Sequence, residues 1–206
     1  MSQIAFYILS DVHGFIFPTD FSSREKDLPM GLLKANHLIE QDCVHYDGSV
    51  KIDNGDFLQG SPLCNYLVSK LKSSLPLTSI YNRLGFDFGI VGNHEFNYDL
   101  PYLKQAINQL HYPVLCANII ENTQPFTGQG IHYFKVNDLT IGTIGLTTQY
   151  IPHWEQPDYI KTLTFNSAVH TLKSELPTLR EKSDIVVVSY HGGFERDLDL
   201  TLIHIS

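Results

Sequence analysis

Short apolar segments alternate with longer amphipathic ones along most of the chain. The apolar segments are rich in Ile, Val, Phe and Tyr, and the longer segments carry apolar residues at helical spacing. This alternation is typical of sheet layers flanked by helices, so it predicts an α/β fold. The predicted strands, in chain order, cover residues 4–10, 50–53, 86–91, 113–117, 131–136, 139–145 and 185–190.

Helical periodicity predicts helices over 30–41, 100–110 and 165–180, the last weakened by an internal proline. Pro62 is expected in the first turn of a further helix, since a missing backbone N–H costs nothing there. The dipeptide 137–138, Asn-Asp, predicts a tight hairpin turn between two strands. No repeat, low-complexity tract or linker interrupts the pattern, so residues 1–206 are expected to form one domain.

Composition narrows the possible functions. The 206 residues are 43% hydrophobic and 17% charged, which excludes the low hydrophobicity and high charge of disordered chains. The 14 Lys and Arg residues against 22 Asp and Glu residues give a formal charge of −8. That balance argues against a nucleic-acid binder, although a cationic metal site would still attract an anionic substrate locally.

The sequence carries weaker signals for the cellular compartment and the oligomeric state. The three cysteines are far apart and odd in number, which supports neither a disulfide framework nor a zinc ribbon. The first ten residues lack a basic region and lead into a polar cluster, and no apolar run has the length of a membrane span. A cytoplasmic protein without a membrane partner is therefore expected, and the pattern fixes no oligomeric state.

Four loops, each directly after a predicted strand, hold nearly all the potential metal ligands. Imidazole and oxygen ligands together suit Mn, Fe, Co or Zn, and a carboxylate can bridge two such ions about 3.5–4 Å apart. Each motif alone is a weak signal, but four in order after four strands are hard to obtain by accident. The loops are Asp11-Val12-His13-Gly14, Asn54-Gly55-Asp56, Gly92-Asn93-His94-Glu95 and Tyr190-His191-Gly192-Gly193.

The spacing of Asp11 and His13 in the first motif predicts how their side chains point. Residues two apart in an extended segment point the same way. Asp11 and His13 are therefore expected to reach one ion from an extended backbone, while Val12 turns into the core.

The ordered set resembles the calcineurin-like metallophosphoesterases, whose pattern runs D-x-H, G-D, G-N-H-E/D, H and G-H-x-H. Residues 53–62 (DNGDFLQGSP), 92–98 (GNHEFNY) and 191–196 (HGGFER) look like the branch of 5′-nucleotidases and 2′,3′-cyclic-nucleotide 2′-phosphodiesterases. The similarity runs from about residue 4 to residue 199. It implies a β-sandwich flanked by helices and hydrolysis of phosphate esters, most of all nucleotides.

The resemblance also implies roles for single residues. Asp11 and His13 would hold the first of two divalent ions, Asn93 and His191 the second, and Asp56 would bridge them. His94 would be the catalytic residue rather than a ligand, lying over the phosphate while metal-bound hydroxide attacks in line. The ligand types do not distinguish Mn, Zn, Fe and Co, although manganese is a natural first choice for loading.

Two residues next to His94 are candidates for a supporting role. Glu95 either orients loop amides or is simply solvated. Asn97 stands where many 5′-nucleotidases have Asp and resembles the cyclic-phosphodiesterase branch; its amide is expected to hydrogen-bond the His94 imidazole. Asp99 is expected to cap the helix that follows.

The family's last motif, G-H-x-H, does not occur before Ser206. The sequence therefore predicts a catalytic domain that is incomplete at its C-terminus, and His204 is a poor replacement for the missing histidines. The absence of the G-H-x-H motif suggests an alternative function, in which the chain is a catalytically impaired fragment that binds metal or nucleotide.

Overall fold

The computed structural model describes residues 3–20, 22 and 27–193. Residues 194–196 of the motif that begins at His191, and His204, lie outside the described residues. The strands are β1 (Ile4–Leu9), β2 (Gly48–Asp53), β3 (Phe88–Ile90), β4 (Val114–Leu115), β5 (Ile119–Glu121), β6 (Gln124–Pro125), β7 (Ile131–Val136), β8 (Leu139–Thr147), β9 (Leu163–Phe165) and β10 (Ile185–His191). The α-helices are α1 (Leu32–Asp42), α2 (Pro62–Tyr66), α3 (Leu75–Tyr81), α4 (Leu100–Gln109), α5 (Pro157–Ile160) and α6 (Ala168–Lys182).

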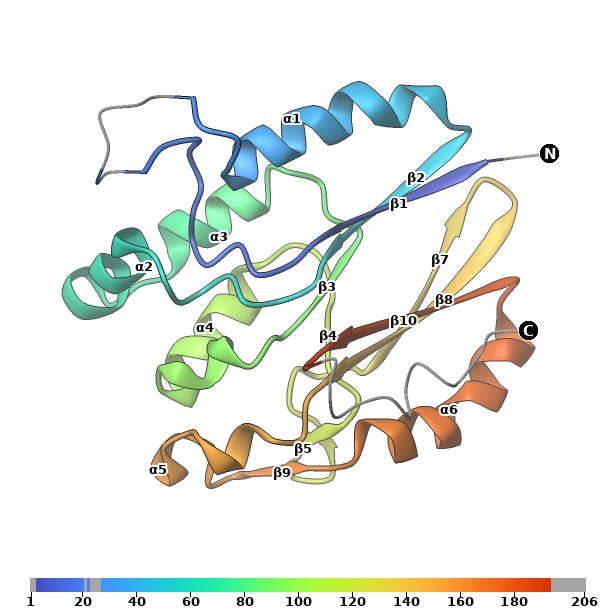
Figure 1. Ribbon diagram of the computed structural model, residues 1–206. Helices are drawn as coiled ribbons and strands as arrows, with labels where there is room; N and C mark the ends of the chain where they lie inside the picture. Colours follow the sequence, from blue (N-terminus) through green and yellow to red (C-terminus); the bar gives the residue numbers. More distant parts are fainter. Residues whose placement is uncertain (1–2, 21, 23–26, 194–206) are drawn as a thin grey trace.

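Two sheets form the centre of the molecule (Figure 1). The first has the order β1-β2-β3-β4 with every neighbouring pair parallel. The second has the order β10-β8-β7, in which β10 runs parallel to β8 and β7 runs antiparallel to it. A small third sheet pairs β5 with β6 and β9. The predicted α/β class and sandwich are confirmed by this arrangement.

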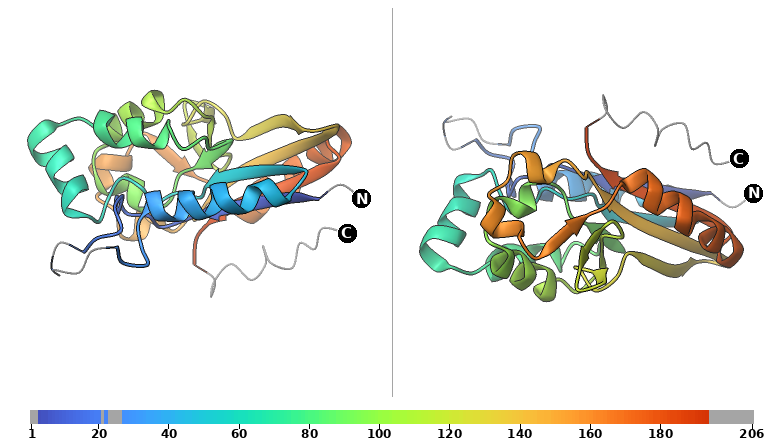
Figure 2. Two further views of the ribbon diagram at one scale, coloured as in Figure 1. Left: turned by 90° about the horizontal axis from the view of Figure 1, so that it is seen from above. Right: turned by 90° about the horizontal axis from the view of Figure 1, so that it is seen from below.

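Three apolar clusters hold together four layers, which are the helices α1 to α4, the first sheet, the second sheet and α6. The first lies among α1 to α4 and the loops beneath them, and the second fills the space between the two sheets. The third packs α6 against β8, and Figure 2 shows α1 and α6 on opposite outer sides of the molecule. No helix within the described ranges is long and apolar enough to cross a membrane. The cluster between the sheets consists of Val50, Ile52, Phe88, Ile90, Leu115 and Ile141.

Most predicted elements are confirmed, with errors at their ends. The hairpin turn at residues 137–138 joins β7 and β8 as expected, and Asp99 caps α4 by accepting a hydrogen bond from the Tyr102 amide. The third predicted helix begins at Ala168 rather than at residue 165. Phe165 instead pairs with Ile119 in the third sheet, and Ser167 caps the helix. Such pairing depends on a partner strand far away in the chain, so local periodicity does not show it.

The described cysteines are thiols without disulfide partners. Cys64 and Cys116 are buried in the first apolar cluster, and Cys43 is half-buried at the end of α1. The expectation that no disulfide framework exists is confirmed.

Candidate metal centre

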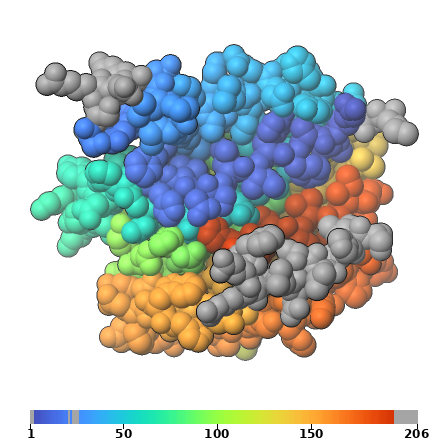
Figure 3. Space-filling model, viewed as in Figure 1, coloured from blue at the N-terminus to red at the C-terminus, as the bar shows by residue number. Residues whose placement is uncertain are grey.

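Parallel strands bring the four polar loops to one edge of the sheets. The carboxyl ends of β1, β2 and β3 are neighbours because these strands run in the same direction. β10, from the second sheet, reaches the same place: the Ser189 hydroxyl donates to Asn54 Oδ1 at 2.6 Å. In Figure 3 the surface after β1 (blue) borders that of β10 (red). Residues about 180 positions apart in sequence therefore share one site.

The backbone at the candidate ligands is strained. Asp11, His13 and Asp56 have φ angles of 57°, 51° and 60°, in the left-handed region that residues with a Cβ rarely adopt. Hydrogen bonds between the loops hold this conformation, from the Asp11 amide to the Gly55 carbonyl and from the His13 amide to the Asp56 carbonyl. Strain of this kind costs about 1–3 kcal/mol per residue and clusters at functional sites.

The extended geometry expected for Asp11 and His13 is wrong. β1 ends at Leu9, and both residues lie in left-handed turns beyond it. The two side chains nevertheless converge, with His13 Nε2 at 3.8 Å from Asp11 Oδ1. Val12 packs against the first apolar cluster, as expected.

Two groups of ligand atoms converge on Asp56. Asp11, Asp56 and His191 form one group, and His13, Asp56 and His94 form the other; within each group the ligand atoms all lie within 4.8 Å of one another. Asp56 Oδ2 is 3.1 Å from His191 Nε2 and 4.0 Å from His13 Nε2. The carboxylate of Asp56 is thus common to both groups, which is the position that a bridging ligand needs.

Backbone carbonyls aim the two imidazoles. His13 Nδ1 lies 2.7 Å from the carbonyl oxygen of Gln59, and His191 Nδ1 lies 2.6 Å from that of Asn54. Because a carbonyl only accepts, each Nδ1 must carry a proton, which leaves Nε2 as the ring nitrogen that faces Asp56. Metal-bound histidines in proteins are oriented in this way. The donor set therefore fits divalent ions. The sequence does not reveal the role of the Asn54 and Gln59 carbonyls, because every residue carries a carbonyl.

The Asp56 and His191 side chains form a buried, hydrogen-bonded pair. Asp56 is 1% exposed and His191 is 7% exposed. Burial alone would lower the pKa of His191, but the hydrogen bond and charge of Asp56 raise it to about 9. Burial raises the pKa of Asp56, but the hydrogen bonds and charges of His191 and His94 together outweigh it, and the net pKa is lowered. Without metal, the structure stabilises the ion pair at neutral pH.

Asn93 and His94 follow β3. Asn93 is half-buried and precedes the short helical turn η3 (His94–Asn97) as its N-cap residue. The His94 amide donates to Asp56 Oδ1 at 2.8 Å, and its ring meets the His13 ring edge to face with centroids 5.2 Å apart. His94 Nδ1 lies 2.6 Å from Asn97 Oδ1, the contact expected from the sequence.

Glu95 connects two of the four loops. Its side chain has no exposed surface. Its two oxygens accept hydrogen bonds from four backbone amides at 2.6–3.1 Å. Burial first, and then the charge of Asp56, raise the pKa of Glu95, while the amides favour the carboxylate. The donors are the amides of Asp56, Phe57, Leu58 and Gly92.

Glycine is required where these two loops touch. Gly55 has a φ of 86°, and a Cβ there would lie 2.4–2.9 Å from the backbone of residues 91 and 92. A Cβ on Gly92 would overlap the Asp56 carboxylate. The loops therefore approach so closely only because both positions lack side chains.

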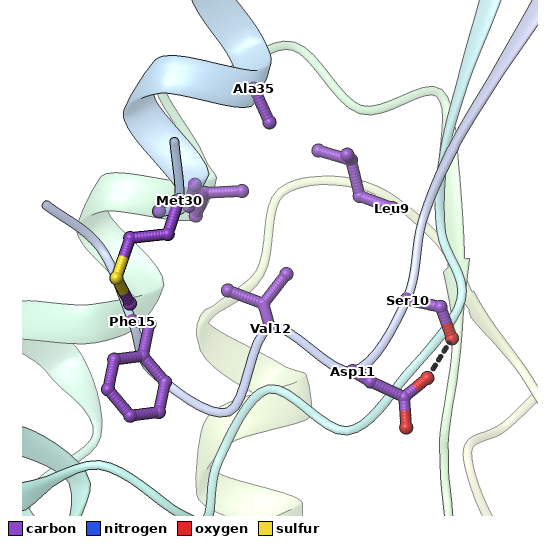
Figure 4. Close-up of a pocket in the computed structure, with 9 residues that line it drawn as sticks. Leu9, Ser10, Asp11, Val12, Phe15, Met30 and Ala35 are labelled. Carbon is purple, nitrogen blue, oxygen red and sulfur yellow. Dashed lines mark hydrogen bonds between the residues drawn. The ribbon is translucent and has the colours of Figure 1, made fainter. Parts of the chain in front are cut away.

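An apolar pocket opens beside Asp11. Figure 4 shows the Asp11 carboxylate next to the Ser10 hydroxyl, which donates to it at 2.5 Å. Asp11 is the exposed member of the candidate ligands, and the pocket has a volume of about 310 Å³. Its walls are formed by Leu9, Val12, Phe15, Met30, Gly31, Leu32 and Ala35.

Asp53, at the end of β2, makes folding depend on pH. The residue is 2% exposed and accepts a hydrogen bond from the Tyr112 hydroxyl at 2.8 Å. Burial raises the pKa of Asp53 to about 7, although the Tyr112 hydrogen bond opposes the change. A carboxyl whose pKa is higher in the folded than in the unfolded chain stabilises the fold at low pH, and this stabilisation is lost as the pH rises from about 4 to about 7.

We expect Asp53→Asn to remove that dependence. Between about pH 4 and about pH 8, the unfolding free energy of the original chain should fall relative to the variant by on the order of 4 kcal/mol. Urea denaturation of both proteins in EDTA, at a series of pH values, measures the difference. A difference that stays constant with pH would contradict the assignment.

We compared the chain with known proteins to find which of them it is similar to. No protein-family model matches the chain. It is 35% identical over 202 residues to the 2′,3′-cyclic-nucleotide 2′-phosphodiesterase/3′-nucleotidase of Salmonella typhimurium, an alignment that covers 91% of this chain and 31% of that protein. The curated relatives from Haemophilus influenzae and Yersinia enterocolitica are likewise covered over 30% and 31% of their length, so the chain spans about a third of these proteins.

Solved structures give the same result. A candidate 5′-nucleotidase from Staphylococcus aureus, in complex with alpha-ketoglutarate, matches with a TM-score of 0.90 and 63% identity, covering 95% of this chain and 38% of that one. The calcineurin-like phosphoesterase YfkN from Bacillus subtilis matches with a TM-score of 0.83 and 25% identity, covering 92% of this chain and 62% of that one.

Together with the layered fold and the convergent ligands, these similarities identify the fold of the calcineurin-like metallophosphoesterases. Within this superfamily the chain is similar to proteins named as 2′,3′-cyclic-nucleotide 2′-phosphodiesterase/3′-nucleotidase and 5′-nucleotidase, of which it spans about a third.

Proposed function

We propose that the described residues belong to one catalytic domain that hydrolyses nucleotide phosphate esters, either nucleoside monophosphates or 2′,3′-cyclic nucleotides. The observation that carries the proposal is the convergence of two ligand groups on the single buried carboxylate of Asp56. The relatives named as nucleotidases and phosphodiesterases support the choice of nucleotides.

The proposed centre would take two divalent cations. Asp11 and His13 would hold one, Asn93 and His191 the other, and Asp56 both, whereas the close groups in the structure join Asp11 to His191 and His13 to His94, each through Asp56. When bound, such ions neutralise phosphate oxygens and lower the pKa of water, so that a nucleophile is available near neutral pH. The backbone carbonyls at Asn54 and Gln59 keep the two imidazoles aimed at the centre, and Glu95 keeps the Asp56 loop in register with the His94 loop.

His94 is proposed to act on the leaving group. Its imidazole lies in the group around Asp56 and is also held by Asn97, so its orientation is set before substrate arrives. As the bond between phosphorus and the ester oxygen breaks, His94 gives its proton to that oxygen. An imidazole is suited to this step because its ordinary pKa lies near neutrality.

Metal stoichiometry tests the proposal first. The purified chain is equilibrated with Mn²⁺, freed of unbound ion and analysed for metal and protein content. About two ions per chain, together with Mn²⁺-dependent hydrolysis of 2′,3′-cyclic AMP or AMP, is the expected result.

Two histidine variants serve as a matched pair. His191→Ala should lower the number of bound ions, whereas His37→Ala, at an exposed position on α1, should leave it unchanged. One ion or none, with no turnover by the pure protein, would instead identify the chain as a catalytically impaired fragment that binds metal or nucleotide.

A further inference from the structure

A chain of hydrogen bonds leads from His94 to a carboxylate outside the four motifs. Asn97 Oδ1 lies 2.6 Å from His94 Nδ1, and Asn97 Nδ2 donates to Glu155 Oε2 at 2.8 Å. Glu155 is 58 residues away from Asn97 in sequence, and all three side chains are half-buried. The Asn97 amide is thus held from both sides.

Glu155 determines which way the Asn97 amide faces. An ionised carboxylate only accepts hydrogen bonds, so the group of Asn97 that faces Glu155 must be its NH₂. The amide oxygen must then face His94, where it only accepts. It follows that His94 Nδ1 carries a proton and that Nε2 is the nitrogen left to exchange one.

The position of Glu155 is itself fixed by the fold. Its amide donates to the carbonyl of Ile151 at 3.0 Å, and Ile151 is fully buried at the start of the short helical turn η4 (Ile151–His153). The other carboxylate oxygen, Oε1, accepts from the Gln156 amide at 2.9 Å. α5, which follows, packs against η3, the turn that carries His94 and Asn97. The carboxylate is therefore anchored before it contacts Asn97.

We propose that Glu155 is a positioning residue, which acts through the Asn97 amide to keep the proton of His94 on Nδ1 and to leave Nε2 as the atom that serves the leaving oxygen. The proposal rests on the function proposed above. Nδ1 keeps its hydrogen throughout the reaction: a protonated His94 loses the Nε2 proton to the ester oxygen and becomes the neutral Nδ1–H form. A tautomer protonated at Nε2 alone would leave Nδ1 facing an acceptor without a hydrogen bond, which costs about 1–3 kcal/mol.

The tautomer of His94 is the direct test. Long-range ¹H–¹⁵N spectra of the metal-free protein, recorded at alkaline pH, distinguish Nδ1–H from Nε2–H in the neutral ring. The original chain should show Nδ1–H. Glu155→Ala and Glu155→Gln should each lower the ratio of Nδ1–H to Nε2–H by about tenfold, the equivalent of one typical hydrogen bond. Glu181→Ala, at an exposed site on α6, is the control.

A second substitution makes the test sharper. In the Asn97→Asp background residue 97 only accepts, so His94 keeps the Nδ1–H form whatever faces it from position 155. Glu155→Gln should then leave the tautomer unchanged and also relieve the repulsion between two carboxylates, so that the double variant is more stable than Asn97→Asp alone. The effect of Glu155→Gln on the tautomer must therefore depend on residue 97.

Activity gives an independent readout. Glu155→Gln should lower kcat about tenfold with little change in KM, because a residue that acts through Asn97 on His94 affects the chemical step rather than substrate binding. An unchanged His94 tautomer in both single Glu155 variants would overturn the proposal. If the tautomer shifts but the protein never turns over substrate, the positioning role stands and the proposed hydrolase function fails.

Discussion

Asp56→Ala is expected to lower phosphoester hydrolysis by at least about 1,000-fold and to reduce bound metal below two ions per chain. The carboxylate belongs to both ligand groups, so its removal affects both ions at once. Its loss also leaves the buried His191 without the partner that raises its pKa. Steady-state kinetics and metal analysis of the same preparation measure the two effects.

Folding must be separated from chemistry in this variant. Breaking a buried ion pair costs about 3–5 kcal/mol, so Asp56→Asn, which keeps the shape of the side chain, is measured beside it by thermal unfolding. Asp138→Ala, in the exposed turn between β7 and β8, is the matched control for loss of a carboxylate. Unchanged hydrolysis by a folded Asp56→Ala protein would show that the bridging assignment is wrong.

Glu95→Gln is expected to destabilise the fold by about 2–6 kcal/mol. The change replaces one acceptor oxygen by an NH₂ group, which then faces backbone N–H donors in a site with no access to water. Two of the four amide hydrogen bonds are lost, and each buried donor left unpaired costs about 1–3 kcal/mol. Urea denaturation at neutral pH measures the loss.

The same variant should also loosen the site. Glu95 Oε2 accepts from the Asp56 and Gly92 amides and Oε1 from the Phe57 and Leu58 amides, so the loop after β2 loses part of its anchor whichever oxygen is replaced. Glu181→Gln on the exposed face of α6 is the control, with an expected change within about 0.5 kcal/mol. A loss for Glu95→Gln no larger than that of this control would mean that the buried carboxylate does not hold the loops.

The residues of the site could be predicted from the sequence, because the types of the residues and their order along the chain are visible there. Asp11, His13, Asp56, His94 and His191 were each predicted, and the structure brings them into two overlapping groups. The catalytic role of His94 and the ligand roles of the other four stay predictions. The reason offered for the first pair was wrong, since Asp11 and His13 converge through left-handed turns that neighbouring loops stabilise.

The fold was predicted best where the signal is local. β1, β10 and the β7–β8 hairpin follow from apolar runs and turn residues, and they occur as expected. The strands of the third sheet have two or three residues each, too few for a periodic pattern, and their pairing depends on partners up to about 45 residues away.

The sequence by itself determined the α/β class, the ligand types and their places after strands, because apolar periodicity and residue chemistry are properties of short segments. Only the tertiary structure decided which groups aim and hold those ligands. Each of these groups orients another one. The carbonyls of Asn54 and Gln59 orient the imidazoles of His191 and His13, four backbone amides hold Glu95, and the Glu155 carboxylate orients the Asn97 amide. These side-chain orientations arise when strands that are distant in sequence pack side by side, so no local sequence pattern predicts them.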